Sequence, residues 1–139
     1  MLFLDTSALL KRFVEEDGTA VLLALMDQDP DWAASALAMA EAEVTLCHRG
    51  LDESEEAAQR FRLRTDWERF TVVPVDAQCL LKAAEIGCTA KVRTLDAIHL
   101  AAAARLPKPL AFVTFDRRQA AAAPGLGLHL ATGPEVRPF

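Results

Sequence analysis

The sequence predicts an α/β fold, a three-layer α/β/α sandwich around a mostly parallel central sheet. Short apolar or β-branched runs alternate with longer helix-like stretches along the chain, and this alternation is typical of a parallel sheet with helices on both faces. At 139 residues, 52% of them hydrophobic, the chain is long enough to bury one core and too short for two ordinary domains. We therefore expect a single domain over residues 1–139.

The first half of the chain predicts two strands and four helices. The apolar runs at residues 2–4 and 31–35 have the length of strands. Gly18 and Gly50 separate helix-like stretches, because glycine commonly interrupts or ends a helix. The expected helices cover residues 7–14, 19–26, 36–49 and 53–70.

The second half predicts three strands and three helices. Residues 71–75 are rich in β-branched side chains, which favour a strand. Asp76 follows this run and is a suitable N-cap for the next helix, and two prolines interrupt the chain before the strand at residues 110–115. The other expected elements are helices over residues 76–87, 95–105 and 116–123 and a strand at 128–131, while residues 133–139 show no pattern.

Composition and charge exclude several classes of protein. No apolar run approaches the roughly 20 residues of a membrane helix, and no basic segment precedes the apolar start, so we expect a cytoplasmic protein without a signal peptide or membrane contact. The net charge of −5 argues against loose, non-specific nucleic-acid binding. Cys47, Cys79 and Cys88 have unrelated spacings and form no CxxC motif, so we expect three buried, reduced thiols rather than a zinc site or disulfides.

Acidic residues directly follow three of the predicted strands. Asp5, Asp76 and Asp116 stand at these positions, and the carboxyl ends of the strands are where sites form in an open α/β sheet. Each aspartate also precedes a helix, so helix capping is the alternative role for each one.

Two further acidic positions lie inside apolar helical surroundings. Asp96 stands near the start of a helix that is apolar nearly all round. A buried carboxylate there needs a partner or a metal ion, although the helix dipole also favours a negative charge at that end. Glu41 and Glu43 lie on different stripes of the helix at 36–49, and periodicity leaves open which of them faces the core.

Carboxylates that converge at one sheet edge repel each other unless a cation neutralises them. Mg²⁺ and Mn²⁺ prefer oxygen ligands, and such ions activate water and hold phosphate oxygens during phosphodiester hydrolysis. The acidic residues therefore suggest a metal-dependent phosphodiesterase.

Four segments of the chain resemble the acidic segments of PIN-domain ribonucleases. Residues 4–13, LDTSALLKRF, resemble the family's opening segment; residues 94–101, TLDAIHLA, resemble the third, and residues 113–118, VTFDRR, the fourth. Residues 35–46, with a glutamate inside, take the place of the second. Order, spacing and total length are similar to those of VapC toxins from bacterial toxin–antitoxin pairs, over essentially the whole chain.

The resemblance implies a Mg²⁺-dependent endoribonuclease that hydrolyses RNA phosphodiester bonds, with Mn²⁺ as an alternative ion, on a PIN-like α/β fold. Carried over residue by residue, the family's acidic quartet falls on Asp5, Glu41, Asp96 and Asp116, with the three aspartates as metal ligands. The family's spacing within the second segment favours Glu41, and Glu43 remains the alternative.

The comparison also implies supporting residues. Ser7 and Thr114 would hydrogen-bond a carboxylate or a water, with capping or turn formation as the alternative. Arg93 and Arg117 are candidates for contacts with RNA phosphates, with solvated surface charge as the default. His99 is interpreted as a packed or hydrogen-bonded histidine rather than a base.

The expected partners are the RNA substrate, a cognate VapB-like antitoxin with a basic segment over the acidic site, and a second copy of the chain in a homodimer. Trp32, Phe13 and Phe61 are candidate contacts for such partners, with burial in the core as the equal alternative.

Three other classes compete with the nuclease. A phosphoacceptor receiver-like domain has paired acids at the first strand and a lysine after a late one, whereas Asp5 stands alone and Asp116 follows the late strand. A dehalogenase-like phosphatase has a second aspartate where Ser7 stands. A non-catalytic PIN-fold binding module would bind a partner and RNA yet cleave nothing with any divalent ion.

Overall fold

Five parallel strands form the central sheet of the computed structural model, which describes residues 1–131. The strands run in the spatial order β3-β2-β1-β4-β5 and every neighbouring pair is parallel. Their bounds are β1 Leu2–Leu4, β2 Trp32–Ser35, β3 Thr71–Val73, β4 Ala111–Val113 and β5 His129–Leu130. The predicted α/β fold is confirmed, with all of the strands parallel rather than most of them.

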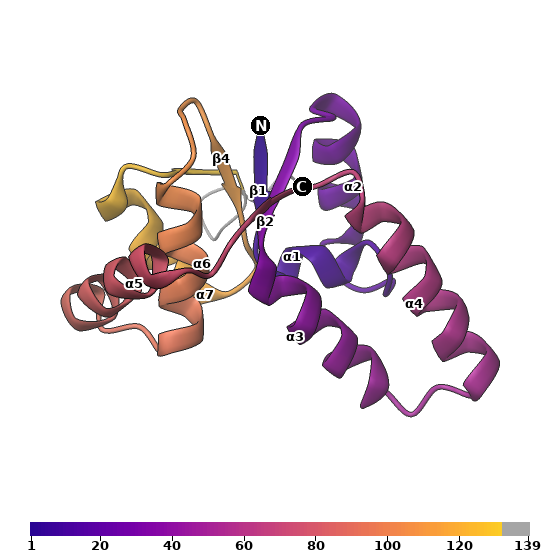
Figure 1. The fold of residues 1–139 in the computed structure, drawn as a ribbon. Coiled ribbons are helices and arrows are strands. Elements are labelled where there is room, and N and C mark those ends of the chain that lie inside the picture. Colours follow the sequence, from indigo (N-terminus) through magenta and orange to yellow (C-terminus); the bar gives the residue numbers. More distant parts are fainter. Residues whose placement is uncertain (132–139) are drawn as a thin grey trace.

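Helices cover both faces of the sheet (Figure 1). One face carries the four helices of the first half of the chain and the other carries the helices that follow β3. Their bounds are α1 Thr6–Lys11, α2 Thr19–Gln28, α3 Ala36–Cys47, α4 Glu53–Trp67, α5 Ala77–Ala90, α6 Thr94–Ala104 and α7 Arg117–Ala122, followed by the short 3-10 helix η1 Ala123–Leu126.

The sheet separates two hydrophobic cores. Leu2 and Leu4 of β1 pack into the core shared with α1 to α4, and Phe3 packs into the core shared with α5 to α7, because successive side chains of a strand point to opposite faces. Phe3 stacks on Phe112 of β4 with ring centroids 5.6 Å apart. Burial on both faces explains why the central strands are continuous apolar runs rather than alternating ones.

Most differences from the expected elements concern their ends. The helix expected over residues 7–14 ends at Lys11, and the one expected to end at Gly87 continues to Ala90. Gly87 lies where α5 passes close to α6: a β-carbon there would stand 3.7 Å from Cβ of Ala97. The helix ends instead at Lys91, whose φ of 54° is left-handed. Residues 133–139, for which no pattern was expected, lie outside the described residues.

The expectation of three buried thiols was wrong for two of them. Cys79 is buried, whereas Cys47 and Cys88 are exposed. The buried stripe of α5 contains Cys79 and Ile86, and Cys88 lies two residues beyond Ile86 and so on the opposite side of the helix. No helix within residues 1–131 combines the length and the apolarity needed to cross a bilayer.

The three aromatic side chains considered as candidate partner contacts differ in their burial. Trp32 and Phe13 are buried in the core beside α1 to α4, so of the two alternatives the burial one applies to both. Phe61 on α4 is 72% exposed and remains a candidate contact.

Candidate active site

Asp5 lies at the centre of the candidate site, directly after β1. It is only 1% exposed and caps α1, because Oδ1 accepts hydrogen bonds from the backbone N–H of Ala8 (2.9 Å) and from the hydroxyl of Ser7 (2.7 Å). Oδ2 accepts from the hydroxyl of Thr114 at 2.7 Å. Burial raises the pKa of Asp5, although the hydrogen bonds from Thr114, Ala8 and Ser7 act in the opposite direction.

The hydroxyl groups of Ser7 and Thr114 join the ends of β1 and β4. Ser7 Oγ accepts the backbone N–H of Phe115 (2.9 Å), and Thr114 Oγ1 accepts that of Asp116 (3.0 Å). Both hydroxyls therefore hold the Asp5 carboxylate while they fix the chain that leaves β4. This arrangement brings Ser7, Thr114 and Asp5 together, as the sequence comparison implies.

Glu41 reaches toward α1 and α6. Its Oε1 accepts a hydrogen bond from Thr6 Oγ1 at 2.6 Å and lies 2.6 Å from Nε2 of His99, which is 3.2 Å from the same hydroxyl. Burial alone would raise the pKa of Glu41, but the hydrogen bonds from His99 and Thr6 outweigh it and the pKa is lowered. Glu41 is therefore a carboxylate at neutral pH.

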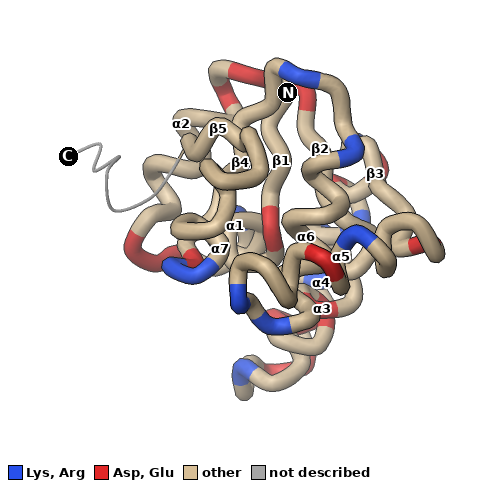
Figure 2. The backbone as a smooth tube through the Cα atoms, turned by 90° about the vertical axis from the view of Figure 1, so that its left-hand side faces the viewer, with Lys and Arg blue, Asp and Glu red and all other residues tan. Residues whose placement is uncertain are grey.

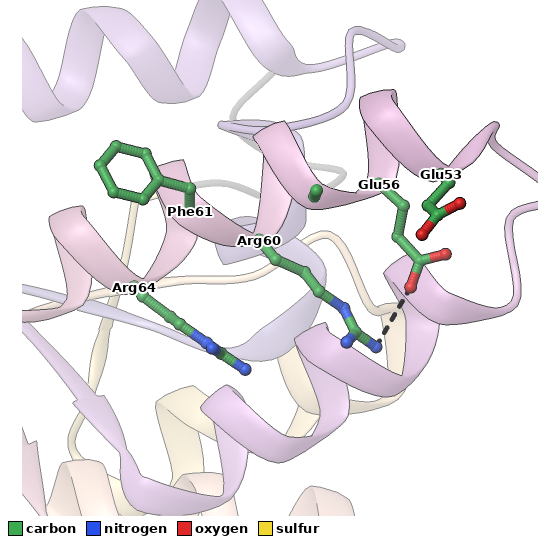
Figure 3. Close-up of a pocket in the computed structure, with 6 residues that line it drawn as sticks. Glu53, Glu56, Arg60, Phe61 and Arg64 are labelled. Carbon is green, nitrogen blue, oxygen red and sulfur yellow. Dashed lines mark ion pairs between the residues drawn. The ribbon is translucent and has the colours of Figure 1, made fainter.

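Glu43 lies on a different surface, between α3 and α4. Its Oε1 pairs with Nε of Arg64 at 2.6 Å. Arg64 also lines a shallow pocket of about 400 Å³ on α4, where Arg60 pairs with Glu56 (Figure 3). Of the two glutamates, only Glu41 contacts residues that lie beside the strand-end aspartates.

Asp96 and Asp116 are linked through Gln119 of α7. Asp96, in the first turn of α6, accepts the Nε2–H of Gln119 at 3.0 Å on Oδ1 and the Nε–H of Arg93 at 3.2 Å on Oδ2. Asp116 caps α7, because its Oδ1 accepts the backbone N–H of Arg118 (2.9 Å) and of Gln119 (3.0 Å). Gln119 therefore connects the two carboxylates through its side chain and its backbone.

These contacts form one network at the carboxyl edge of the sheet. It runs from Asp5 through Thr114 to Asp116 and through Gln119 to Asp96. Within residues 1–131, however, no three acidic, histidine or cysteine side chains are grouped in the way that one metal ion requires. The structure thus connects three of the four predicted acids, Asp5, Asp96 and Asp116, through hydroxyl and amide groups. Glu41 bonds instead to Thr6 and His99. Asp5 and Asp116 also act as helix caps. Asp76, left out of the predicted quartet, caps α5 and pairs with Arg105.

The cationic side chains near the edge fall into two groups. Lys11 pairs with Glu16 and Arg12 pairs with Asp66. Both cations are therefore paired with carboxylates outside the predicted quartet. The exposed basic residues lie in the connection between α5 and α6 and at the start of α7, at the end of the sheet where Asp5 lies (Figure 2). They are Lys91, Arg93, Arg117 and Arg118.

Sequence reasoning missed Thr6 and Gln119 as members of the network. Gln119 offered a signal, since it is a single amide side chain that opens a run of alanines three residues after Asp116. Thr6 offered none, because its partners Glu41 and His99 lie 35 and 93 residues away.

Comparisons with known proteins point to one family. The PIN domain model matches residues 2–124 of the chain. Ribonuclease VapC47 of Mycobacterium tuberculosis is 34% identical over 142 residues, which cover 99% of this chain and 100% of that protein. The fold is similar to FitAcB from Neisseria gonorrhoeae (TM-score 0.74, 20% identity, 94% and 96% of the two chains). It is also similar to a toxin–antitoxin complex from Klebsiella pneumoniae (TM-score 0.71, 20% identity, 96% and 99%).

Proposed function

Because this chain belongs to the PIN-domain family, we propose that it is a metal-dependent endoribonuclease and the toxin of a VapBC-type toxin–antitoxin pair. The observation that carries the proposal is the network that joins Asp5, Asp96 and Asp116 at the carboxyl edge of an all-parallel sheet. The 34% identity to a ribonuclease over the whole chain supports the choice of RNA as substrate.

The proposed cofactor is Mg²⁺, with Mn²⁺ as an alternative, and Asp5, Asp96 and Asp116 are its proposed ligands. The donor chemistry fits, because Mg²⁺ binds carboxylate oxygens, usually those of one or two carboxylates, and keeps several waters. The three aspartates are joined by hydrogen bonds but form no ready-made cluster of three ligands within residues 1–131. The burial of Asp5, which raises its pKa, also fits, since a nearby cation offsets the cost of a buried negative charge. When bound, a divalent ion lowers the pKa of water and neutralises charge on the phosphate.

The residues of the chain have distinct roles in this proposal. Thr114 and Ser7 orient the Asp5 carboxylate and hold it against the end of β4. Glu41, kept ionised by Thr6 and His99, is the proposed fourth acid and would add negative charge beside the three aspartates. Arg93 and Arg117, which lie exposed near this edge, are positioned to contact RNA phosphates.

Cleavage of total cellular RNA by the purified chain tests the proposal. We expect discrete fragments with Mg²⁺ or Mn²⁺, none with EDTA, and none from Asp96→Asn. Asp76→Asn is the matched control, because Asp76 also follows a strand and caps a helix but pairs with Arg105 outside the network. Full activity in Asp96→Asn would contradict the assignment of Asp96. Binding of RNA and a partner without cleavage under any divalent ion would favour the non-catalytic module.

The proposed protein partner is a VapB-like antitoxin. Support comes from the likeness to the toxin–antitoxin complex from Klebsiella pneumoniae and from exposed apolar side chains of α3 and α4, Val44 and Phe61. Co-expression with the candidate antitoxin should yield a complex that does not cleave RNA, and Phe61→Asp should weaken it if this surface is in contact. The homodimer remains a prediction, to be checked by sedimentation of the chain alone.

A further inference from the structure

The two carboxylate oxygens of Asp96 have partners of opposite character. Oδ1 accepts a hydrogen bond at 3.0 Å from Gln119, a side chain that is only 4% exposed. Oδ2 pairs at 3.2 Å with Arg93, whose side chain is 69% exposed. One oxygen is therefore held by a buried, neutral donor from inside the protein, and the other by an exposed cation at the surface.

Burial of the Gln119 side chain lowers the stability of the fold, and its packing gives no reason for an amide at this position. Its Oε1 is buried without a hydrogen-bond partner among residues 1–131, and an unpaired buried acceptor lowers stability. An apolar side chain of similar size would fill the space without that loss. What the amide provides is its Nε2–H to Asp96, next to a backbone N–H that is held by Asp116.

Arg93, in contrast, is free to leave. It occupies the N-cap position of α6, but its side chain makes no capping hydrogen bond, so its departure from Asp96 costs the helix nothing. Its only ion pair within residues 1–131 is the one with Asp96. The Asp96 side chain is only 10% exposed, so its carboxylate needs a replacement partner when Arg93 leaves. Lys91 lies two residues from Arg93 in the same exposed connection.

We propose that Gln119 is a positioning residue that fixes Asp96, and that Arg93 is a displaceable cation that occupies Oδ2 until a divalent ion replaces it. The inference rests on the proposed metal-dependent function. Gln119 keeps the carboxylate in one orientation while the partner of Oδ2 changes. The released guanidinium group then stands beside Lys91, where a phosphate of the RNA substrate can accept from it.

Mn²⁺ binding to the RNA-free chain, measured by calorimetry, tests both roles without reference to cleavage. Arg93→Ala should bind Mn²⁺ about two- to fivefold more tightly, the effect of removing a cation that competes for Oδ2 of Asp96. Arg49→Ala is the control, because it removes the same charge from an exposed position that is remote from the network and not paired with Asp96, and it should change the affinity less than about twofold. Equal effects of the two substitutions would overturn the role of Arg93.

Gln119→Leu should weaken Mn²⁺ binding about tenfold or more, as the loss of a residue that orients a metal ligand does. Gln59→Leu is its control, since Gln59 on α4 also carries a buried, unpaired Oε1 and should affect thermal stability but not Mn²⁺ affinity. If Gln119→Leu fails to fold, Gln119→Met, which keeps the length of the side chain, gives the same test. Unchanged Mn²⁺ affinity in a folded Gln119 variant would overturn its role.

The wild-type chain and Asp96→Asn separate this inference from the proposed function. A wild-type chain that binds no Mn²⁺ would overturn the metal-dependent function and the inference together. Binding that requires Asp96 but is insensitive to Arg93 and Gln119 would overturn the inference alone.

Discussion

Replacement of Asp5 by asparagine separates the charge of this side chain from its role as a helix cap. Asparagine caps helices about as well as aspartate, so Asp5→Asn keeps an oxygen for Ala8 and Ser7 and removes the negative charge. Its amide N–H takes the place of Oδ2, and the Thr114 hydroxyl, which donates to that oxygen in the wild type, can rotate to accept instead. Burial raises the pKa of Asp5 from 3.8 despite the hydrogen bonds that it accepts. The ionised carboxylate therefore opposes folding at neutral pH when no metal is bound, and we expect Asp5→Asn to be more stable than the wild type there.

The sign of the pH dependence follows from proton binding. A carboxyl group with a raised pKa binds its proton more tightly in the folded than in the unfolded chain. Its contribution to stability is thus present below pH 3.8 and is lost as the pH rises through the folded pKa. Each unit of the upward shift corresponds to about 1.4 kcal/mol at neutral pH. The unfolding free energy of the wild type relative to Asp5→Asn should fall with rising pH and level off above the folded pKa.

Urea unfolding followed by tryptophan fluorescence, in EDTA between about pH 4 and 8, measures this difference. Asp76→Asn is the control of opposite sign: a hydrogen bond from the backbone N–H of Cys79, and then Arg105, lower the pKa of Asp76. Its stabilising contribution is present above pH 3.8 and is lost as the pH falls through the folded pKa. A less stable Asp5→Asn at neutral pH, or a difference that does not vary with pH, would refute the reasoning and leave Asp5 as a cap alone.

Two further predictions concern the choice of glutamate and the packing of glycines. Glu41→Gln should reduce the cleavage rate at least about 100-fold, whereas Glu43→Gln, which only breaks a pair with an exposed arginine, should stay within about twofold; equal losses in an RNA cleavage assay would contradict the assignment. Gly87→Ala should raise stability by about 0.5–1 kcal/mol in thermal melts, because its new Cβ meets only ordinary contacts at 3.6 and 3.7 Å. Gly18→Ala should lower stability by about 1–3 kcal/mol, since its φ is +95° and its Cβ would stand 2.5 Å from the ring of Phe115; melts that move together would refute the distinction.

The elements of the fold were predictable because their signals are local. Each signal lies within a few residues of the element that it determines. Apolar runs coincide with strands, Asp76 caps the helix that follows it, and Gly18 precedes the start of α2. The ends were less predictable where tertiary packing overrides the local signal. Gly87 is the example, because α5 continues through this glycine to Ala90, and no local pattern reports the packing of α5 against α6 that holds the helix there.

The hydrogen-bond and ion-pair partners of the site residues could not be predicted from the sequence alone. Glu41 and Glu43 have similar exposure, 28% and 26% for their side chains, so no periodicity separates them. Their difference lies in partners from distant segments, His99 for one and Arg64 for the other. Whether the four acids of the predicted quartet act in catalysis stays a prediction, for which the network around Asp5 is the support.

The central position of β1 has a consequence for the order in which contacts form during synthesis on the ribosome. β1 is made first, yet one of its two neighbours, β4, lies more than 100 residues later in the chain. The hydroxyl that holds Asp5 and the amide that holds Asp96 both come from that late part of the chain, from Thr114 and Gln119. Both contacts are absent from a nascent chain until the residues of β4 and α7 have left the ribosome. Any activity of this site therefore arises late in synthesis, after most of the chain has been made.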